Sequence, residues 1–514
     1  MKKLERDSAN PEPTSLTIVR GAGLSLIGRI VGGGLRYAGQ VLLARLLGPA
    51  SYGLYALALA IYQVLEAIAT MGLQHGAVRY TAIYYSQRDL GRVYGVLRSA
   101  LTLTFVVGGG LAVLLYALAP LLAERFFGEP ALGQLLQVFA VGIPWGAAFW
   151  VAATATTGAL TTRYLVFARD FFHPLVFIVV LVVLHHWLGL VGAAIAWPVA
   201  TLMAFGISLH GVTRAFPAQS AQQPAVSDQL STALLKFSAP LLIGELSWLV
   251  TLWTDVLMLG YFRTPDEVGL YRAASQTALP LTMMLLAINT IFGPTIAALH
   301  HRRDRVQLSA LFRLTTLWSF AIGLIGFLLL AIAGRELLQL FGGEFPRAYE
   351  PLVILGLGQL VNAGTGSVGL MLMMGGRPYH FFWSDLALIL GNPVLNALLI
   401  PRWGMVGAAL ATAASLAGVN LVRLWLVFRL DGLHPYHRGY LKVLVVGGLA
   451  GAGAALVYYL WAWQLHFLIA LGLCGAVLGG LYLLGLWGFF TAEARQLLQA
   501  LQKPPSSEPA QFGT

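Results

Sequence analysis

The chain has 514 residues, of which 58% are hydrophobic and 10% are charged, and its formal net charge is +11 at pH 7. So much apolar surface exceeds what one soluble core of this length could bury, which excludes a water-soluble globular protein. The basic residues are dispersed in short clusters between apolar runs, so no nucleic-acid partner is expected. The one cysteine, Cys474, excludes an internal disulfide and a cysteine-based metal site.

Fourteen apolar runs follow one another along the chain. Each has about 20 residues or more, enough to cross roughly 30 Å of hydrocarbon as a helix. We expect them near residues 16–44, 53–74, 94–120, 132–158, 165–185, 189–212, 234–261, 268–298, 310–333, 351–375, 380–400, 404–428, 440–462 and 466–490. The first run is too long for a cleaved signal peptide, and we interpret it as an uncleaved span. The sequence therefore predicts an all-α polytopic membrane protein of about 14 transmembrane helices.

The positive charges indicate which side of the membrane each loop faces. Lys and Arg are concentrated in the tails and in alternate loops when the map starts from a cytoplasmic N-terminus. Cytoplasmic loops carry this excess in membrane proteins generally. We therefore expect both termini in the cytoplasm and an even number of crossings.

Internal repetition divides the chain into two similar halves. Pro49 with Gly53–Tyr55 recurs as Pro265 with Gly269–Tyr271, and Gly189–Ala196 recurs as Gly404–Ala411 at almost the same offset along the chain. Each half holds six spans, so both copies enter the membrane from the same side as a parallel duplication. We predict a cytoplasmic tail at 1–15, an N-lobe at 16–213, a cytoplasmic linker at 214–232, a C-lobe at 233–430, a helix pair at 431–490 and a cytoplasmic tail at 491–514.

Arg29, Arg36 and Arg272 lie inside expected spans, where a charge costs roughly 3 kcal/mol at the helix centre. Arg29 and Arg36 are seven residues apart and share one face of the first span, which Gln40 extends; Arg272 lies in the eighth span. Guanidinium groups suit phosphate oxygens, so we predict that the three arginines bind an anionic substrate. The alternative is that they pair with acids of neighbouring spans, or that Arg36 reaches the outer interface.

Acids also lie inside the expected spans, at Glu66, Glu245, Asp255 and Asp385. Asp385 shares a helical face with Asn392 and Asn396. These groups are candidates for binding a proton or Na⁺ that drives transport, or for accepting hydrogen bonds from sugar hydroxyls. The alternative is a structural role as partners of the arginines. We find no nucleophile, metal-ligand or acid–base constellation, so we expect no catalytic residues, no resident metal and no enzyme.

Three motifs point to a family. They are Leu46–Pro49 followed by Tyr52–Tyr55, the echo Val268–Ala274, and Trp403–Ala409 at the start of span 12. With these motifs the chain resembles the polysaccharide transport family, which includes Wzx-type oligosaccharide flippases. That family belongs to the multidrug/oligosaccharidyl-lipid/polysaccharide exporter superfamily.

The resemblance implies a flippase that moves a polyprenyl-diphosphate-linked oligosaccharide from the inner to the outer leaflet of the bacterial inner membrane. Two six-helix lobes would surround a cationic cavity and work by alternating access, with Arg29, Arg36 and Arg272 facing the diphosphate. The C-terminal helix pair would guide the isoprenoid. Expected partners are this lipid-linked glycan, membrane lipids and polysaccharide polymerase machinery, and the protein is expected to be a monomer.

Two other functions compete with this interpretation. A multidrug antiporter of the same superfamily shares the duplication, but cationic drugs favour a cavity dominated by acids, whereas arginines occupy the first span here. A polysaccharide polymerase or ligase would use the same lipid-linked donor. Such an enzyme needs a substantial outer loop with catalytic residues, and the longest expected outer loop, near residues 334–350, is short.

Overall fold

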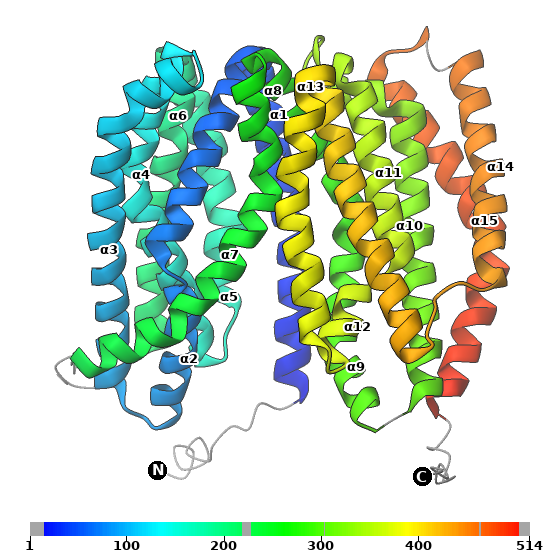
Figure 1. Cartoon of the computed structure of the whole chain (residues 1–514), viewed down its shortest axis with the longest axis horizontal. Coiled ribbons are helices and arrows are strands. Elements are labelled where there is room, and N and C mark those ends of the chain that lie inside the picture. The colour runs from blue at the N-terminus through cyan, green and yellow to red at the C-terminus, as the bar shows by residue number, and fades with distance from the viewer. Residues whose placement is uncertain (1–14, 218–227, 303, 462–463, 503–514) are drawn as a thin grey trace, which may run out of the picture. The chain divides into compact units, whose positions relative to one another are not determined.

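Helices account for all the regular structure in the part of the chain that the computed structural model describes, residues 15–217, 228–302, 304–461 and 464–502 (Figure 1). The first half contains α1 (Ser15–Thr70), α2 (Leu73–Ser86), α3 (Leu90–Leu121), η1 (Leu122–Phe126), α4 (Pro130–Ala155), η2 (Thr156–Ala159), α5 (Arg163–Val166), η3 (Phe167–Phe172) and α6 (His173–Ala215). The second half contains α7 (Asp228–Phe262), α8 (Pro265–Ala278), η4 (Leu279–Thr282), α9 (Met283–His301), α10 (Arg305–Gln339), η5 (Phe345–Ala348), α11 (Tyr349–Thr365), α12 (Val368–Met374), α13 (Pro378–Asp431), α14 (Arg438–Leu460) and α15 (Phe467–Gln502). The predicted all-α class is confirmed.

Nine helices in the described ranges are long and apolar enough to cross a membrane, or ten if η5–α11 and the bent continuation α12 form one span. Three of the nine are 53 to 56 residues long. A straight helix of that length would measure about 80 Å, far more than the roughly 30 Å of a hydrocarbon core. Each of the three contains a non-helical glycine, and Figure 1 shows α13 as two arms joined at a turn. The total of fourteen crossings stays a prediction.

Apolar side chains cover the outside of these helices as well as the inside. Val113 on α3 and Leu484 on α15 are each more than 70% exposed, and many other large aliphatic residues are at least half exposed. In water such a surface would associate, whereas in a bilayer the lipid tails are its solvent. The chain is therefore a multi-pass membrane protein.

The chain forms two compact units. Unit 1 consists of Met1–Leu47 and Leu54–Trp253, and unit 2 consists of Gly48–Gly53 and Thr254–Thr514. In unit 1, α4 packs against both α3 and α6, and in unit 2, α11 packs against α10 and α13. The last two helices, α14 and α15, pack on α10 through Leu317, Leu324 and Tyr482 among others, and so belong to unit 2.

The duplication seen in the sequence is also present in the backbone. Helix α6 breaks at Gly189 (φ 55°, ψ −129°), and α13 breaks at Gly404, the equivalent position of the second copy, with nearly the same angles (φ 54°, ψ −132°). A positive φ of this kind is readily adopted only by glycine. The two long helices of the two units therefore turn back through the same conformation.

A second glycine in each unit makes the turn possible. A side chain on Gly192 would meet the carbonyl oxygen of Leu184 at 2.1 Å, and one on Gly407 would meet that of Leu399 at 2.4 Å. These two contacts again occupy equivalent positions of the repeat. Each pair lets the second arm of its helix start directly against the end of the first arm.

Two further glycines of unit 2 each lie against a backbone carbonyl of the other's motif. A Cβ on Gly53 would lie 1.8 Å from the carbonyl oxygen of Pro265, and a Cβ on Gly269 would lie 2.0 Å from that of Pro49. The contact is reciprocal, because the motif of residues 49–53 and its repeat at 265–269 face one another. No residue with a side chain fits at either glycine without moving the backbone.

Candidate functional site

Arg36 lies in the first arm of α1 and pairs with an acid that sequence reasoning missed. Its Nη1 is 2.9 Å from Oδ1 of Asp170, which lies in the π-helical segment η3 and is fully buried. Oδ2 of the same carboxylate accepts a hydrogen bond of 2.9 Å from Nη2 of Arg169. The sequence could have indicated this acid, because Arg169 and Asp170 are adjacent charged residues inside the expected span 165–185.

The approach of α1 to η3 depends on glycine. A side chain on Gly32 would meet the backbone oxygen of Asp170 at 2.6 Å, and one on Gly28 would meet Val166 at 2.3 Å. This small-residue spacing lets two helices pack closely. Gly28 and Gly32 therefore let α1 approach η3 closely enough for Arg36 to pair with Asp170.

The charges at this site do not cancel. One carboxylate faces the guanidinium groups of Arg36 and Arg169, so these three side chains carry a net charge of +1. The side chain of Arg36 is also 47% exposed, which leaves part of its planar donor fork accessible. A surplus positive charge with an accessible guanidinium can bind an anion such as a phosphate. The side chain of Arg29 lies outside the described residues, and Gln40, one turn beyond Arg36, is half-buried.

Arg272 is placed differently from Arg36. It lies in α8, only 6% exposed, and its guanidinium interacts with Tyr52 and lies near Tyr271. Tyr52 belongs to the short segment Gly48–Gly53, and its ring packs edge-on against Phe345. In this structure Arg272 holds that segment of α1 within unit 2.

Asp255 is the centre of a buried polar network in unit 2. Its Oδ2 accepts hydrogen bonds from the hydroxyls of Tyr271, at 2.6 Å, and Thr412. Its Oδ1 accepts one from Nδ2 of Asn396 at 2.7 Å, and this amide also reaches Oδ1 of Asn392 at 3.0 Å. The network joins α7, α8 and both arms of α13. It brings together three of the predicted residues and adds Tyr271 and Thr412, which were missed although Tyr271 stands in a repeated motif.

The network has an unused oxygen. Asn396 is fully buried, and within the described ranges its Oδ1 has no hydrogen-bond partner. Asp255 likewise forms no ion pair there. Hard cations such as Na⁺ prefer carboxylate, amide and hydroxyl oxygens, and this is the donor set assembled here.

The other predicted acids each have a partner of their own. Glu66 is half-buried in α1 and accepts a hydrogen bond of 2.8 Å from the Tyr62 hydroxyl. Glu245 of α7 lies 2.9 Å from Nε2 of His75, and both side chains are more than a third exposed. Neither acid contacts an arginine in the described part of the chain.

Asp385 does not join the Asp255 network, although it shares α13 with Asn392 and Asn396. Its Oδ1 accepts a hydrogen bond of 2.8 Å from Nη2 of Arg423 in the second arm of the same helix. The Arg423 Nε also donates to Ser384 at 2.8 Å, and its guanidinium lies over the ring of Phe381. These contacts tie the two arms of α13 together, which is the structural role that the sequence left open.

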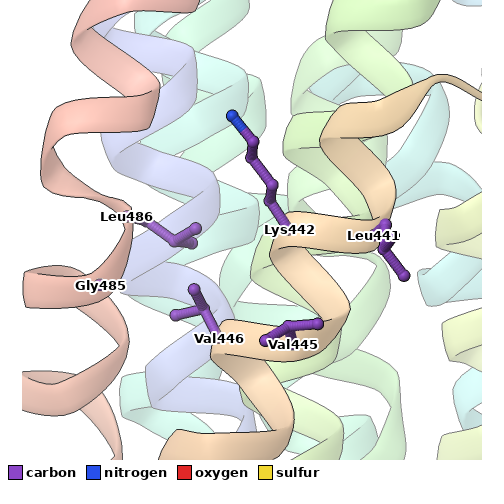
Figure 2. Close-up of a pocket in the computed structure, with 6 residues that line it drawn as sticks. All are labelled: Leu441, Lys442, Val445, Val446, Gly485 and Leu486. Atoms are coloured by element: carbon purple, nitrogen blue, oxygen red, sulfur yellow. The ribbon is translucent and has the colours of Figure 1, made fainter.

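A groove of about 300 Å³ lies between α14 and α15. It is lined by Leu441, Lys442, Val445, Val446, Gly485 and Leu486. Figure 2 shows the side chains of Val446 and Leu486 directed toward one another between the two helices. The surface is aliphatic apart from Lys442, so a hydrocarbon chain would fit it. The role of this helix pair in guiding an isoprenoid stays a prediction.

Known proteins share this sequence and this fold. The chain is 26% identical to the succinoglycan biosynthesis transport protein ExoT of Rhizobium meliloti over 84% of this chain and 83% of that protein. It is 27% identical to the probable lipid II flippase MurJ of Vibrio cholerae over 79% of each chain. A solved lipid II flippase MurJ in an inward closed conformation superimposes with a TM-score of 0.70 at 14% identity, over 91% of this chain and 99% of that one.

The family itself is identified by a model of conserved sequence. The model described as "polysaccharide biosynthesis protein" matches residues 18–300, which is more than half of the chain. The matched region includes the arginine face of α1, the segment Gly48–Gly53, Asp170 and Asp255. This chain belongs to the polysaccharide biosynthesis protein family.

Proposed function

We propose that this protein is a flippase for polyprenyl-diphosphate-linked oligosaccharides, which it moves from the inner to the outer leaflet by alternating access for surface polysaccharide biosynthesis. The family assignment and the relatives named as a succinoglycan transport protein and a lipid II flippase support this function. The observation that carries it is the surplus positive charge at Arg36, Arg169 and Asp170. A diphosphate headgroup is the anion that such a lipid carries.

The Asp255 network is the proposed coupling site. A buried carboxylate with no ion pair in the described ranges is costly to keep charged unless a cation or several donors compensate it. Na⁺ would use the oxygens of Asp255, Asn396 and Thr412, and a proton would bind Asp255 itself. Movement of either cation down its electrochemical gradient by way of this site would supply the driving force for transport.

The setting follows from the same proposal. The protein would act in the cytoplasmic membrane of a bacterium with both termini inside, as a monomer that passes its glycan to polymerase machinery. It would carry out transport without bond-making chemistry and without a resident cofactor. A multidrug antiporter is the competing function, but the accessible charged site of unit 1 attracts anions, and the curated relatives described above are named for glycans or their lipid carriers.

Reconstitution tests the function directly. The purified protein is placed in vesicles with polyprenyl-diphosphate-linked oligosaccharide extracted from the host, and the fraction reaching the opposite leaflet is measured with a glycan-modifying enzyme that cannot cross the membrane. We expect transfer well above that of protein-free vesicles. Transfer equal to that of protein-free vesicles, combined with export of a cationic dye, would replace the flippase with the antiporter.

Arg36 supplies the sharpest variant in this assay. We expect Arg36→Ala to reduce transfer at least tenfold, and Arg36→Lys to be intermediate because an ammonium group lacks the planar donor fork. Arg92→Ala is the matched control, since Arg92 pairs with Asp89 at the exposed start of α3. Wild-type transfer by Arg36→Ala at normal protein levels would remove the diphosphate site from the proposal.

A further inference from the structure

The helix formed by α11 and α12 is broken inside unit 2. Helix α11 ends at Thr365, Gly366 adopts φ 70° and ψ −153°, and α12 begins at Val368 at an angle of 43° to α11. A break of this kind frees backbone groups, which is tolerated at membrane depth only inside protein or beside a polar cavity. In transporters such breaks form substrate sites.

Buried hydroxyl groups gather at the break. Ser367 is 3% exposed and donates a hydrogen bond to Oδ1 of Asn289 on α9. Thr316 of α10 is 1% exposed, and its Oγ1 lies where a side chain on Gly366 would have to go, 2.1 Å from the ideal Cβ position. The hydroxyls of Thr316 and of Ser319, one turn further along α10, have no hydrogen-bond partner in the described ranges. A buried hydroxyl left unpaired destabilises the protein, so a ligand that forms a hydrogen bond with it recovers that free energy.

A ladder of side-chain amides leads to the same place. Nδ2 of Asn420 on α13 donates to Oδ1 of Asn362 at 3.0 Å, and Nδ2 of Asn362 reaches Oε1 of Gln359 at 3.4 Å. Asn362 stands in the last turn of α11, just before the break. Asn362 and Gln359 are half-buried, so both remain reachable. An amide has two donor protons and an oxygen with two lone pairs, and these contacts use only part of the hydrogen-bonding capacity of Asn362 and Gln359, so the rest is left for a ligand.

The chemistry of this cluster differs from that of the other two sites. Its members, Asn289, Thr316, Ser319, Gln359, Asn362, Ser367 and Asn420, are all uncharged, and they offer donors and acceptors together. Sugar hydroxyls both donate and accept, whereas a phosphate needs cationic donors and a cation needs anionic oxygens. The amides that the sequence proposed for sugars, Asn392 and Asn396, are already engaged in the Asp255 network.

We propose that the break between α11 and α12 is the binding site for the oligosaccharide part of the substrate. This proposal rests on the flippase function and adds a location for sugar recognition separate from the diphosphate site at Arg36. Thr316 and Ser319 would donate their hydroxyl protons to sugar oxygens. Asn362 and Gln359 would exchange hydrogen bonds with sugar hydroxyls at the reachable side of the cluster.

Two binding probes separate this proposal from the flippase function. The full-length protein in lipid nanodiscs is titrated with the host's polyprenyl-diphosphate-linked oligosaccharide and with the same polyprenyl diphosphate carrying no sugar. We expect the glycan-bearing lipid to bind at least tenfold more tightly to the wild type. Thr316→Val and Asn362→Leu should each reduce that ratio by about threefold to tenfold, the value of one or two hydrogen bonds, and leave the affinity for the bare lipid unchanged.

Thermal stability excludes a purely structural role. Valine has the shape of threonine without the unpaired hydroxyl, so Thr316→Val should keep or raise the Tm while it weakens glycan binding. Gln134→Leu is the matched control, because this amide is exposed on α4 of unit 1. The sugar site would be overturned if both variants kept the wild-type ratio of affinities, or if the wild type bound the glycan-bearing lipid no more tightly than the bare lipid. Tight binding of the bare lipid would still support recognition of the diphosphate in either case. If the wild type bound neither lipid, the flippase function would fail and this site with it.

Discussion

The Asp255 network of unit 2 has an apolar counterpart in unit 1. When the two copies of the repeat are aligned, Asp255, Tyr271, Asn392, Asn396 and Thr412 correspond to Gln40, Tyr55, Phe177, Leu181 and Trp197. Phe177 and Leu181 are buried, and the Phe177 ring packs against Trp197 with 5.7 Å between centroids. One copy of the repeat therefore has a buried polar network, our proposed cation site, where the other has packed apolar side chains.

The carboxylates at another equivalent pair of positions were kept but used differently. Asp170 and Asp385 occupy the same position in the two copies, and each pairs with arginine. Asp170 is fully buried between two arginines in unit 1, whereas the Asp385 side chain is 37% exposed and meets one arginine in unit 2. At this pair of positions the described residues carry a surplus positive charge in unit 1 and a balanced pair in unit 2. Duplication supplied two copies of one scaffold, and we propose that the two copies bind ions of opposite sign.

The largest effect is expected where the two copies have stayed alike. Gly53→Val and Gly269→Val should each prevent folding, since the new Cβ would lie about 2 Å from a carbonyl oxygen. This oxygen belongs to the backbone, so it cannot move aside as the end of a flexible side chain could. Yield of monodisperse protein in detergent and its Tm measure the effect. Gly110→Ala, on α3 with open space around it, is the control and should not be destabilised. A normal Tm for one of the two valine variants would mean that the contact is not reciprocal.

The paired acids come next. Asp170→Asn should lower the free energy of unfolding by about 2–4 kcal/mol, because two guanidinium groups lose the charge between them. Asp385→Asn should cost about half as much, since Arg423 keeps Ser384 and the ring of Phe381. Chemical denaturation in detergent gives both values. Equal losses would contradict the difference that we draw between the two units.

The proposed cation site can be converted into its counterpart in unit 1. Asn396→Leu installs the residue that unit 1 has at this position and removes the unused Oδ1 together with one donor to Asp255. Saturating Na⁺, at about 100 times its Kd, should stabilise the wild type by about 2.7 kcal/mol, and this gain should disappear in the variant. The gain is measured as the difference in Tm between NaCl and choline chloride. Measuring Tm over a pH series tests whether a proton binds in place of Na⁺. A variant that keeps the full Na⁺ or proton response would place the cation elsewhere.

The smallest effect is expected outside the repeat, in the groove between α14 and α15. Val445→Trp fills the groove with a larger side chain at an exposed position, so the Tm should not change. Transfer of a long-chain polyprenyl substrate should fall about threefold, while a short-chain analogue should be unaffected, since only the long tail needs the groove. Equal loss for both substrates would argue against a role in holding the tail.

The all-α class and the repeat could be predicted because the sequence alone carries their signals, whereas the number of spans stays a prediction. Hydropathy marks each apolar run, and Gly189 and Gly404 mark the same turn in both copies. The pairing partners could not be predicted, because Arg36 and Asp170 are 134 residues apart and Asp255 and Asn396 are 141 apart. The sequence shows that a charge lies in a span, but helix packing determines which group pairs with that charge. The resemblance implied that Arg272 faces the diphosphate, and this role stays a prediction; in this structure Arg272 is buried beside Tyr52.

The six residues Gly48–Gly53 also affect how the chain is connected. They belong to unit 2, although the residues on either side of them belong to unit 1, so the polypeptide passes between the units three times. A cut between Ala215 and Asp228 would leave the second fragment without this piece, and Gly269 without the backbone that it packs against. We expect the two fragments to fold only when they are produced together, because the second fragment needs a segment that the first one contains.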